Sequence, residues 1–140
     1  MRYFSLPCTA EHDNDRHYAP RKGKSDMDKD VQSFIRDFMR SKQKIARYIP
    51  ETVKGFMGLH EKTTASGALE RKHKELIAVG IAVATHCVEC VYLHTQQAVE
   101  AGATAKEVME AAGVAVVMGG GPAFTQLGDV LKALDALGVK

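Results

Sequence analysis

Apolar residues recur at helical spacing along most of the chain beyond residue 26. Val31, Phe34, Ile35 and Phe38 are separated by one, three or four positions, which is typical of a helix that turns one face toward a core. No segment with the two-residue period of a strand competes convincingly. The pattern therefore predicts an all-α fold of about six helices, over residues 26–47, 50–62, 69–85, 87–102, 104–118 and 122–137.

Residues with known preferences for helix ends mark these boundaries. Pro50 is expected at the first position of the second helix, where proline is favoured. Thr104 and Glu107 have the spacing of a capping box, in which each side chain satisfies a backbone N–H of the first helical turn. Residues 119–122, Gly-Gly-Gly-Pro, should break the helical path, and Gly138 should end it.

The chain divides by composition into an extension and one domain. Residues 1–26 are polar and lack a period, so we expect an N-terminal extension that is poorly ordered unless a partner subunit holds it. Residues 27–140 are of a suitable length for a single all-helical domain. The second half of the third predicted helix, within 69–85, is apolar nearly all round, which indicates a buried helix or one shared with another subunit.

The composition narrows the function classes. With 45% hydrophobic and 26% charged residues, the chain is neither fibrous nor wholly disordered. No uninterrupted apolar run approaches the ~20 residues of a membrane span, and residues 1–10 lack the apolar core of a signal peptide. We therefore expect a cytoplasmic protein with no membrane partner.

Charge is distributed unevenly along the chain. Residues 1–74 carry 16 Lys and Arg against 10 Asp and Glu, a balance of +6, whereas residues 75–140 carry 3 against 7, a balance of −4. The basic residues are mixed with acidic ones and have no interleaved aromatic residues, so a solvated surface is favoured over a nucleic-acid partner.

The candidate chemistry lies in the motif Cys87-Val-Glu-Cys90. In a reducing compartment, two cysteines at this spacing indicate a redox pair or half of a metal site. A tetrahedral zinc ion needs four ligands, and Cys87, Cys90, His94 and His86 could supply them. His86 precedes the predicted helix and would require a sharply turned chain, so the redox interpretation is favoured over zinc.

Helical spacing supports a redox role. Cys87 and Cys90 lie three residues apart and therefore on adjacent turns, and His94 follows Cys90 by four residues on the same face. Its imidazole could take or return a thiol proton. Cys87 lies at the expected helix N-terminus, where unpaired N–H groups favour thiolate. A buried structural cysteine pair with a packed histidine is the alternative.

Glu75 is the last charged residue before a ten-residue segment without charge, Leu-Ile-Ala-Val-Gly-Ile-Ala-Val-Ala-Thr. A carboxylate beside a buried segment should be paired or functional. Alternatively, Glu75 simply ends the solvated run Glu-Arg-Lys-His-Lys-Glu, and the residues alone do not separate these two readings.

The stretch from residue 74 to about 132 resembles the AhpD-like / carboxymuconolactone decarboxylase family. The shared pattern is Glu75, eleven residues, Cys87-x-x-Cys90, three residues and His94, followed by the Glu-Ala-Gly-Ala-Thr segment. The resemblance implies an all-helical fold and assembly as a homo-oligomer, a trimer or hexamer. The CxxC motif places the chain near the alkylhydroperoxidase branch rather than the decarboxylase branch.

The resemblance also implies roles for four catalytic residues. Glu75 and His94 would form a proton relay, Cys90 would be the thiol that attacks peroxide, and Cys87 would condense with the resulting sulfenic acid. A dithiol donor, such as a lipoylated or thioredoxin-like protein, would reduce the disulfide. The reaction would need no metal, flavin or haem cofactor.

One residue departs from the family pattern. Glu89 stands where some members have a relay histidine, and a carboxylate disfavours a neighbouring thiolate. Glu89 therefore weighs against high peroxide turnover and leaves disulfide exchange with a protein partner more open. A protein disulfide reductase, a redox sensor, and a carboxymuconolactone-decarboxylase-type catabolic enzyme on the same fold remain as alternatives.

The remaining histidines and the third cysteine carry no clear chemistry in the sequence. The histidines are scattered along the chain and are assigned mainly to the surface. The cysteine is interpreted as a free bystander thiol, with an intermolecular disulfide in oxidised preparations as the alternative. These residues are His12, His17, His60, His73, His86 and Cys8.

Overall fold

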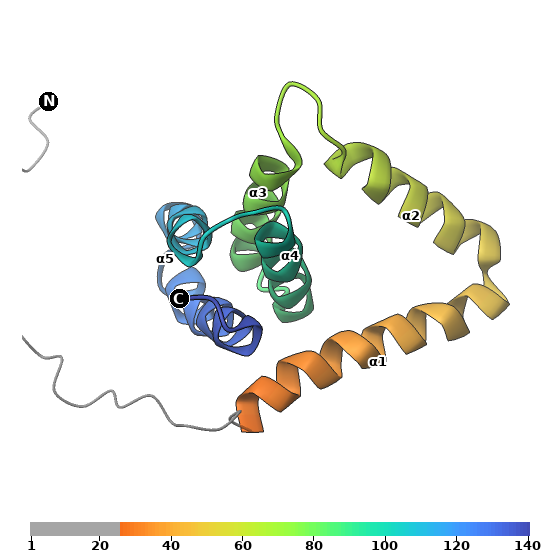
Figure 1. Cartoon of the computed structure of the whole chain (residues 1–140), viewed down its shortest axis with the longest axis horizontal. Coiled ribbons are helices and arrows are strands. Elements are labelled where there is room, and N and C mark those ends of the chain that lie inside the picture. Colours follow the sequence, from red (N-terminus) through yellow and green to blue (C-terminus); the bar gives the residue numbers. More distant parts are fainter. Residues whose placement is uncertain (1–25) are drawn as a thin grey trace, which may run out of the picture.

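The computed structural model describes residues 26–140, and all of its secondary structure there is helical (Figure 1). The predicted all-α class is confirmed. The predicted extension, together with Cys8, His12 and His17, lies almost wholly outside the described residues. The helices are α1 (Asp26–Tyr48), α2 (Pro50–Thr64), α3 (Arg71–Ala84), α4 (Val88–Glu100) and α5 (Ala105–Leu137).

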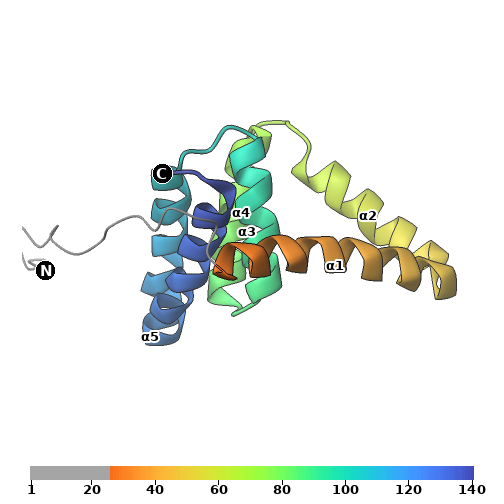
Figure 2. The same ribbon diagram turned by 60° about the horizontal axis from the view of Figure 1, so that its bottom comes forward.

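The last two predicted helices form one element, α5, that is broken at Gly120. This residue has φ 61° and ψ −146°, a conformation that glycine adopts readily because it has no Cβ. The chain turns back there, so that the C-terminus lies at the same end of the molecule as the start of α5 (Figure 2). The predicted break is confirmed, and the count of five or six helices depends only on whether it divides α5.

The core lies among α3, α4 and α5 and is built from small apolar side chains. Val79, Val83, Val91, Val108 and Val130 have no solvent exposure. Burying a valine stabilises a fold by roughly 1.5–3 kcal/mol, so these five side chains make a large contribution.

Two of these helices approach each other closely at a glycine. A Cβ built on Gly80 of α3 would lie 3.2 Å from the carbonyl oxygen of Ala111 in α5. The backbones of α3 and α5 therefore lie close together at this position. Ile77 and Ile81 of α3 are exposed, so this helix buries one face against the core and leaves the other uncovered in the monomer.

Helices α1 and α2 form a V-shaped arm that projects from the α3–α5 bundle (Figure 1). Only the first part of α1 joins the core: Val31 is buried, and the ring of Phe34 contacts Tyr92 of α4 edge-on at a centroid distance of 5.8 Å. Helix α2 has no buried residue. It nevertheless returns the chain toward α3 and α4, which brings its last turns close to the predicted site.

The predicted helix ends agree with the structure to within two residues. Pro50 begins α2, and Gly138 ends α5 in the left-handed conformation with φ 69°. Helix α3 begins at Arg71 rather than near Leu69, because Glu70 is extended. Such differences of one or two residues are ordinary at helix ends.

The capping box at the start of α5 is also confirmed, and it ties this helix to α3. The backbone N–H of Thr104 donates to Glu107 Oε2 at 2.8 Å, and Lys72 Nζ donates to Glu107 Oε1 at 2.9 Å. These bonds, with that from Thr104 first, lower the pKa of Glu107 from 4.5 to about 2. The charged form of this carboxylate is therefore favoured by folding.

By length and composition, α5 is the one described helix that could cross a membrane, and 22% of its most apolar window is buried. The sequence predicts no membrane span, so hydropathy alone does not distinguish a membrane-spanning helix from a helix of a domain core. The break of α5 at Gly120 and its core residues on both sides of that break are features of a helix that packs within a domain.

Replacing Glu107 with glutamine should lower the melting temperature at neutral pH. Because folding lowers this pKa, the stabilisation is fully present above about pH 4.5 and is lost as the pH falls toward about 2. Thermal unfolding of wild type and Glu107→Gln between pH 7 and pH 3 should show a difference in melting temperature that narrows as the pH falls below about 4.5. A difference independent of pH would contradict this assignment.

Candidate functional site

A buried carboxylate on α3 is the centre of the predicted site. Glu75 has no solvent exposure, and its Oε2 lies 2.9 Å from Nδ1 of His94 on α4. The guanidinium Nε of Arg71, one turn earlier on α3, lies 3.7 Å from Oε1. Glu75 is therefore a paired buried residue, and the alternative of a solvated residue at the end of a charged run is wrong.

Gln97 supplies a further contact to the same carboxylate. With its amide nitrogen turned toward Glu75, it donates to Oε1 at 3.1 Å and to Oε2 at 3.2 Å. An ionised carboxylate only accepts hydrogen bonds, so this orientation satisfies both side chains. Two hydrogen-bond donors on α4, His94 and Gln97, and the more distant charge of Arg71 on α3 thus surround the Glu75 carboxylate.

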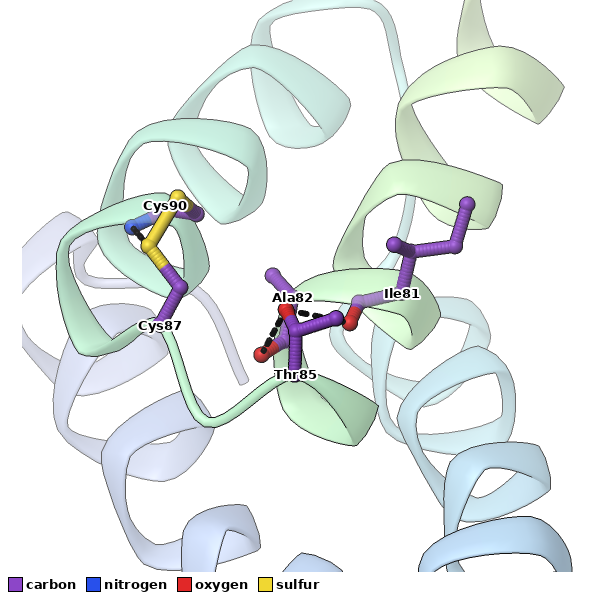
Figure 3. The surroundings of a disulfide bond; sticks show 5 residues. All are labelled: Ile81, Ala82, Thr85, Cys87 and Cys90. Carbon is purple, nitrogen blue, oxygen red and sulfur yellow. Dashed lines mark hydrogen bonds between the residues drawn. A yellow bond between two sulfur atoms is a disulfide. The ribbon is translucent and has the colours of Figure 1, made fainter.

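The two cysteines of the motif form a disulfide bond at the start of α4 (Figure 3). Cys87 is the N-cap residue, and its Sγ accepts a hydrogen bond from the backbone N–H of Cys90 at 3.3 Å. The expected position of Cys87 at a helix N-terminus is confirmed. Both residues are half-buried, so neither sulfur is sealed within the core.

A tight turn between α3 and α4 places Cys87. His86 adopts a positive φ of 56°, which is uncommon for a residue other than glycine. The backbone N–H of Cys87 then donates to the carbonyl of Ala82 at 3.0 Å, while Thr85 Oγ1 donates to the carbonyl of Ile81 at 2.9 Å (Figure 3). These bonds hold the N-terminus of α4 against the end of α3.

Glu75 of α3 and His94 of α4 form one bonded pair, and Cys87 and Cys90, both at the start of α4, form another. His94 follows Cys90 by one turn of α4, as the spacing predicts. Within residues 26–140, however, His94 directs its hydrogen bond to Glu75 and makes none to either sulfur of the disulfide. Glu89 is exposed in the first turn of α4. Whether the four residues are catalytic stays a prediction.

His60 is the residue of this site that the sequence did not identify. It was expected on the surface, but it is half-buried, and its ring lies against that of His94 with centroids 5.8 Å apart and planes inclined by 28°. One signal was present in the sequence: His60 continues the apolar stripe formed by Val53, Phe56 and Met57. Helical spacing placed His60 on the same side of α2 as these residues but did not show what it would meet.

The four-ligand zinc set considered from the sequence does not assemble in this disulfide form. Cys87 and Cys90 are bonded to each other, and His86 is exposed. Among the described residues, the one group of histidine, cysteine or carboxylate side chains with ligand-like spacing is instead His60, Glu75 and His94, whose ligand atoms lie within 4.8 Å of one another.

Replacing Glu75 with alanine should reduce the free energy of unfolding by about 3 kcal/mol, because it leaves the donors of His94 and Gln97 without their buried acceptor. Urea denaturation measures this loss. Glu70→Ala is the matched control, since Glu70 is an exposed carboxylate without a capping bond, and it should change stability by less than about 0.5 kcal/mol. Equal effects of the two substitutions would show that the Glu75 contacts contribute nothing.

Comparison with known proteins identifies relatives that match most of the chain. The model of the carboxymuconolactone decarboxylase family matches residues 50–133. An uncharacterised protein of Cupriavidus necator is 32% identical over 111 residues, which cover 79% of this chain and 98% of that protein.

Two solved structures are similar in both sequence and fold. A carboxymuconolactone decarboxylase family protein from Legionella pneumophila is 37% identical, with a TM-score of 0.72 over 76% of this chain and 95% of that one. A family protein from Thermotoga maritima, for which a part in the antioxidative response has been suggested, is 27% identical, with a TM-score of 0.68 over 75% of this chain and 89% of that one.

Proposed function

The chain belongs to the carboxymuconolactone decarboxylase family, and we propose that it is a thiol-dependent oxidoreductase of the alkylhydroperoxidase type. The observation that carries this proposal is the Cys87–Cys90 disulfide at the N-terminus of α4, one turn from the buried Glu75–His94 pair. A reversible dithiol and a hydrogen-bonded acid–base pair are the groups that thiol-dependent peroxide reduction requires.

The reaction begins when the Cys90 thiolate attacks one oxygen of a hydroperoxide. The O–O bond breaks, the alcohol leaves with a proton, and Cys90 becomes a sulfenic acid. Cys87 then attacks the Cys90 sulfur, water leaves, and the disulfide forms. A dithiol donor protein, lipoylated or thioredoxin-like, returns two electrons and is itself oxidised to a disulfide.

Glu75 and His94 are assigned the transfer of protons. The ionised Glu75 accepts from Nδ1–H of His94 at 2.9 Å, which leaves Nε2 of the neutral ring as the basic nitrogen. This nitrogen takes the thiol proton of Cys90 and returns it to the leaving alkoxide. The carboxylate holds the ring orientation and stabilises the imidazolium that forms between these steps.

The proposal extends to the biological role, the assembly, the cofactor and the location of the protein. The suggested antioxidative role of the Thermotoga maritima relative agrees with peroxide reduction. Exposed Ile77, Ile81, Val117 and Met118 on α3 and α5 suit assembly into a homo-oligomer, a trimer or hexamer. The chemistry uses no cofactor, and we propose a cytoplasmic location, where dithiol donors are reduced.

A second candidate is disulfide exchange with a protein, either as a reductase or as a redox sensor. It is favoured by Glu89, an exposed residue in the first turn of α4 that stands between the two cysteines in the sequence. A carboxylate near a thiol opposes thiolate formation. A catabolic decarboxylase of this family is a third candidate, and its activity should survive replacement of both cysteines.

Steady-state consumption of an organic hydroperoxide, with dihydrolipoamide or reduced thioredoxin as donor, tests the proposed activity. Cys90→Ser should reduce the rate to background, whereas Cys8→Ser should leave it unchanged because Cys8 lies outside the motif. His94→Gln should lower it about 10²-fold or more, the usual contribution of a positioned base. A wild-type rate equal to that of Cys90→Ser would exclude peroxidase function.

The roles of the two cysteines can be separated by mass spectrometry after peroxide treatment. Sulfenic acid should form on Cys90 in the Cys87→Ser variant, because His94 lies one turn from Cys90 and no partner thiol remains to trap the product. The helix N-terminus instead favours Cys87 as the lower-energy thiolate. Sulfenic acid on Cys87 in Cys90→Ser, with none on Cys90 in the converse variant, would reverse the assignment.

A further inference from the structure

We propose that His60, Glu75 and His94 form a binding site for one divalent transition-metal ion, and that Zn²⁺ fits it best. The three side chains come from α2, α3 and α4, and one ligand atom of each lies within 4.8 Å of the other two. The proposal rests on this convergence and does not depend on the redox chemistry of the cysteines.

The donor set suits zinc. Two imidazole nitrogens and one carboxylate oxygen are ligands of Zn²⁺ and other late first-row ions, whereas Mg²⁺ and Ca²⁺ prefer oxygen alone. Three protein ligands leave one position of a tetrahedral ion open to water or a small anion. The proposed metal site therefore keeps one open coordination position, and it lies one turn of α4 from the cysteine pair.

The distances are close to those of a loaded site. Ligand atoms of a tetrahedral zinc ion with bonds of about 2.1 Å lie about 3.4 Å apart. Nδ1 of His94 and Oε2 of Glu75 are already 2.9 Å apart, so the largest closure needed is about 1.4 Å, from the 4.8 Å limit. His60 can make this movement because α2 has no buried residue that fixes it in place.

One ring nitrogen of this group has no hydrogen-bond partner, which supports the binding of a cation there. Nε2 of His60 is buried and has no hydrogen-bond partner within the described part of the chain. A buried polar atom without a partner costs about 1–3 kcal/mol, and native structures rarely leave one unpaired. Coordination of a cation would satisfy this nitrogen and the second lone pairs of the Glu75 carboxylate together.

Two neighbours affect the affinity in opposite ways. Gln97 donates to Glu75 and holds the carboxylate in position, as outer partners of metal ligands commonly do. The guanidinium of Arg71, at 3.7 Å from Oε1 and half-exposed, instead repels a cation. Arg71→Gln should therefore tighten metal binding, which a purely structural role of the group does not predict.

Binding has a consequence for the proposed peroxidase, and this one consequence rests on that function. The ion takes the place of the proton between Glu75 and His94, so a metal-loaded site cannot relay protons. Zinc should therefore inhibit peroxide turnover in wild type and inhibit His60→Ala less strongly.

Cobalt titration of the full-length chain tests the site. The triple variant Cys8→Ser/Cys87→Ser/Cys90→Ser removes the thiols as ligands and should still bind one Co²⁺ per chain, with visible d–d absorption that Zn²⁺ abolishes. Adding His60→Ala should weaken binding more than about tenfold, since even outer partners of a metal ligand contribute 10–100-fold. His73→Ala, an exposed histidine of α3, is the matched control and should change nothing.

The absence of stoichiometric binding in the triple variant, or equal affinities of His60→Ala and His73→Ala, would overturn the proposal. Zinc-induced shifts of the histidine ring resonances provide a test in a protein with all its histidines intact, so misfolding of a variant cannot obscure the result. Shifts at His60 and His94 support the site, and shifts elsewhere alone refute it. Neither measurement requires peroxide turnover, so failure of the enzyme and failure of the site are distinguishable.

Discussion

The hydrogen bond between Glu75 and His94 is the interaction on which the rest of the site depends. A fully buried carboxylate is costly unless it is paired and hydrogen-bonded. Glu75 meets this requirement with donors from His94 at 2.9 Å and from Gln97. Satisfying this one charge requires that the face of α3 with Glu75 meets the face of α4 with His94 and Gln97. Cys90 lies one turn before His94 on that helix, so the same packing places the cysteine pair near the buried pair.

The surrounding core allows this arrangement because its side chains are small. Valine and alanine dominate it, and Gly80 of α3 brings the backbone close to Ala111 of α5. Close packing of short side chains leaves little freedom for helices to shift, so the buried pair sits in a rigid frame. The cysteines lie at the edge of that frame, half-buried at the start of α4, where a substrate or partner thiol can reach them. Rigid acid–base groups beside accessible sulfurs suit the proposed chemistry.

The arm formed by α1 and α2 has a different relation to the site. Several of its apolar side chains, including Tyr48 and Phe56, are exposed, so the core does not cover them. Yet its second helix carries His60 back to the ring of His94. His94 is thus hydrogen-bonded to the bundle through Nδ1, and its ring also lies against a residue of a lightly packed helix. This joins the two proposals, because the same imidazole can move a proton or help to hold an ion.

The sequence alone determined what depends on neighbouring residues. Helix starts at Pro50 and Thr104, the break before Pro122, and the spacing of Cys90 and His94 are local properties, because capping, backbone freedom and the 3.6-residue repeat act within a few positions. Tertiary structure decided which side chains meet across helices. The pairing of Glu75, left open in the sequence, and the approach of His60 to His94 depend on helix rotation and packing over tens of residues, which no local pattern encodes.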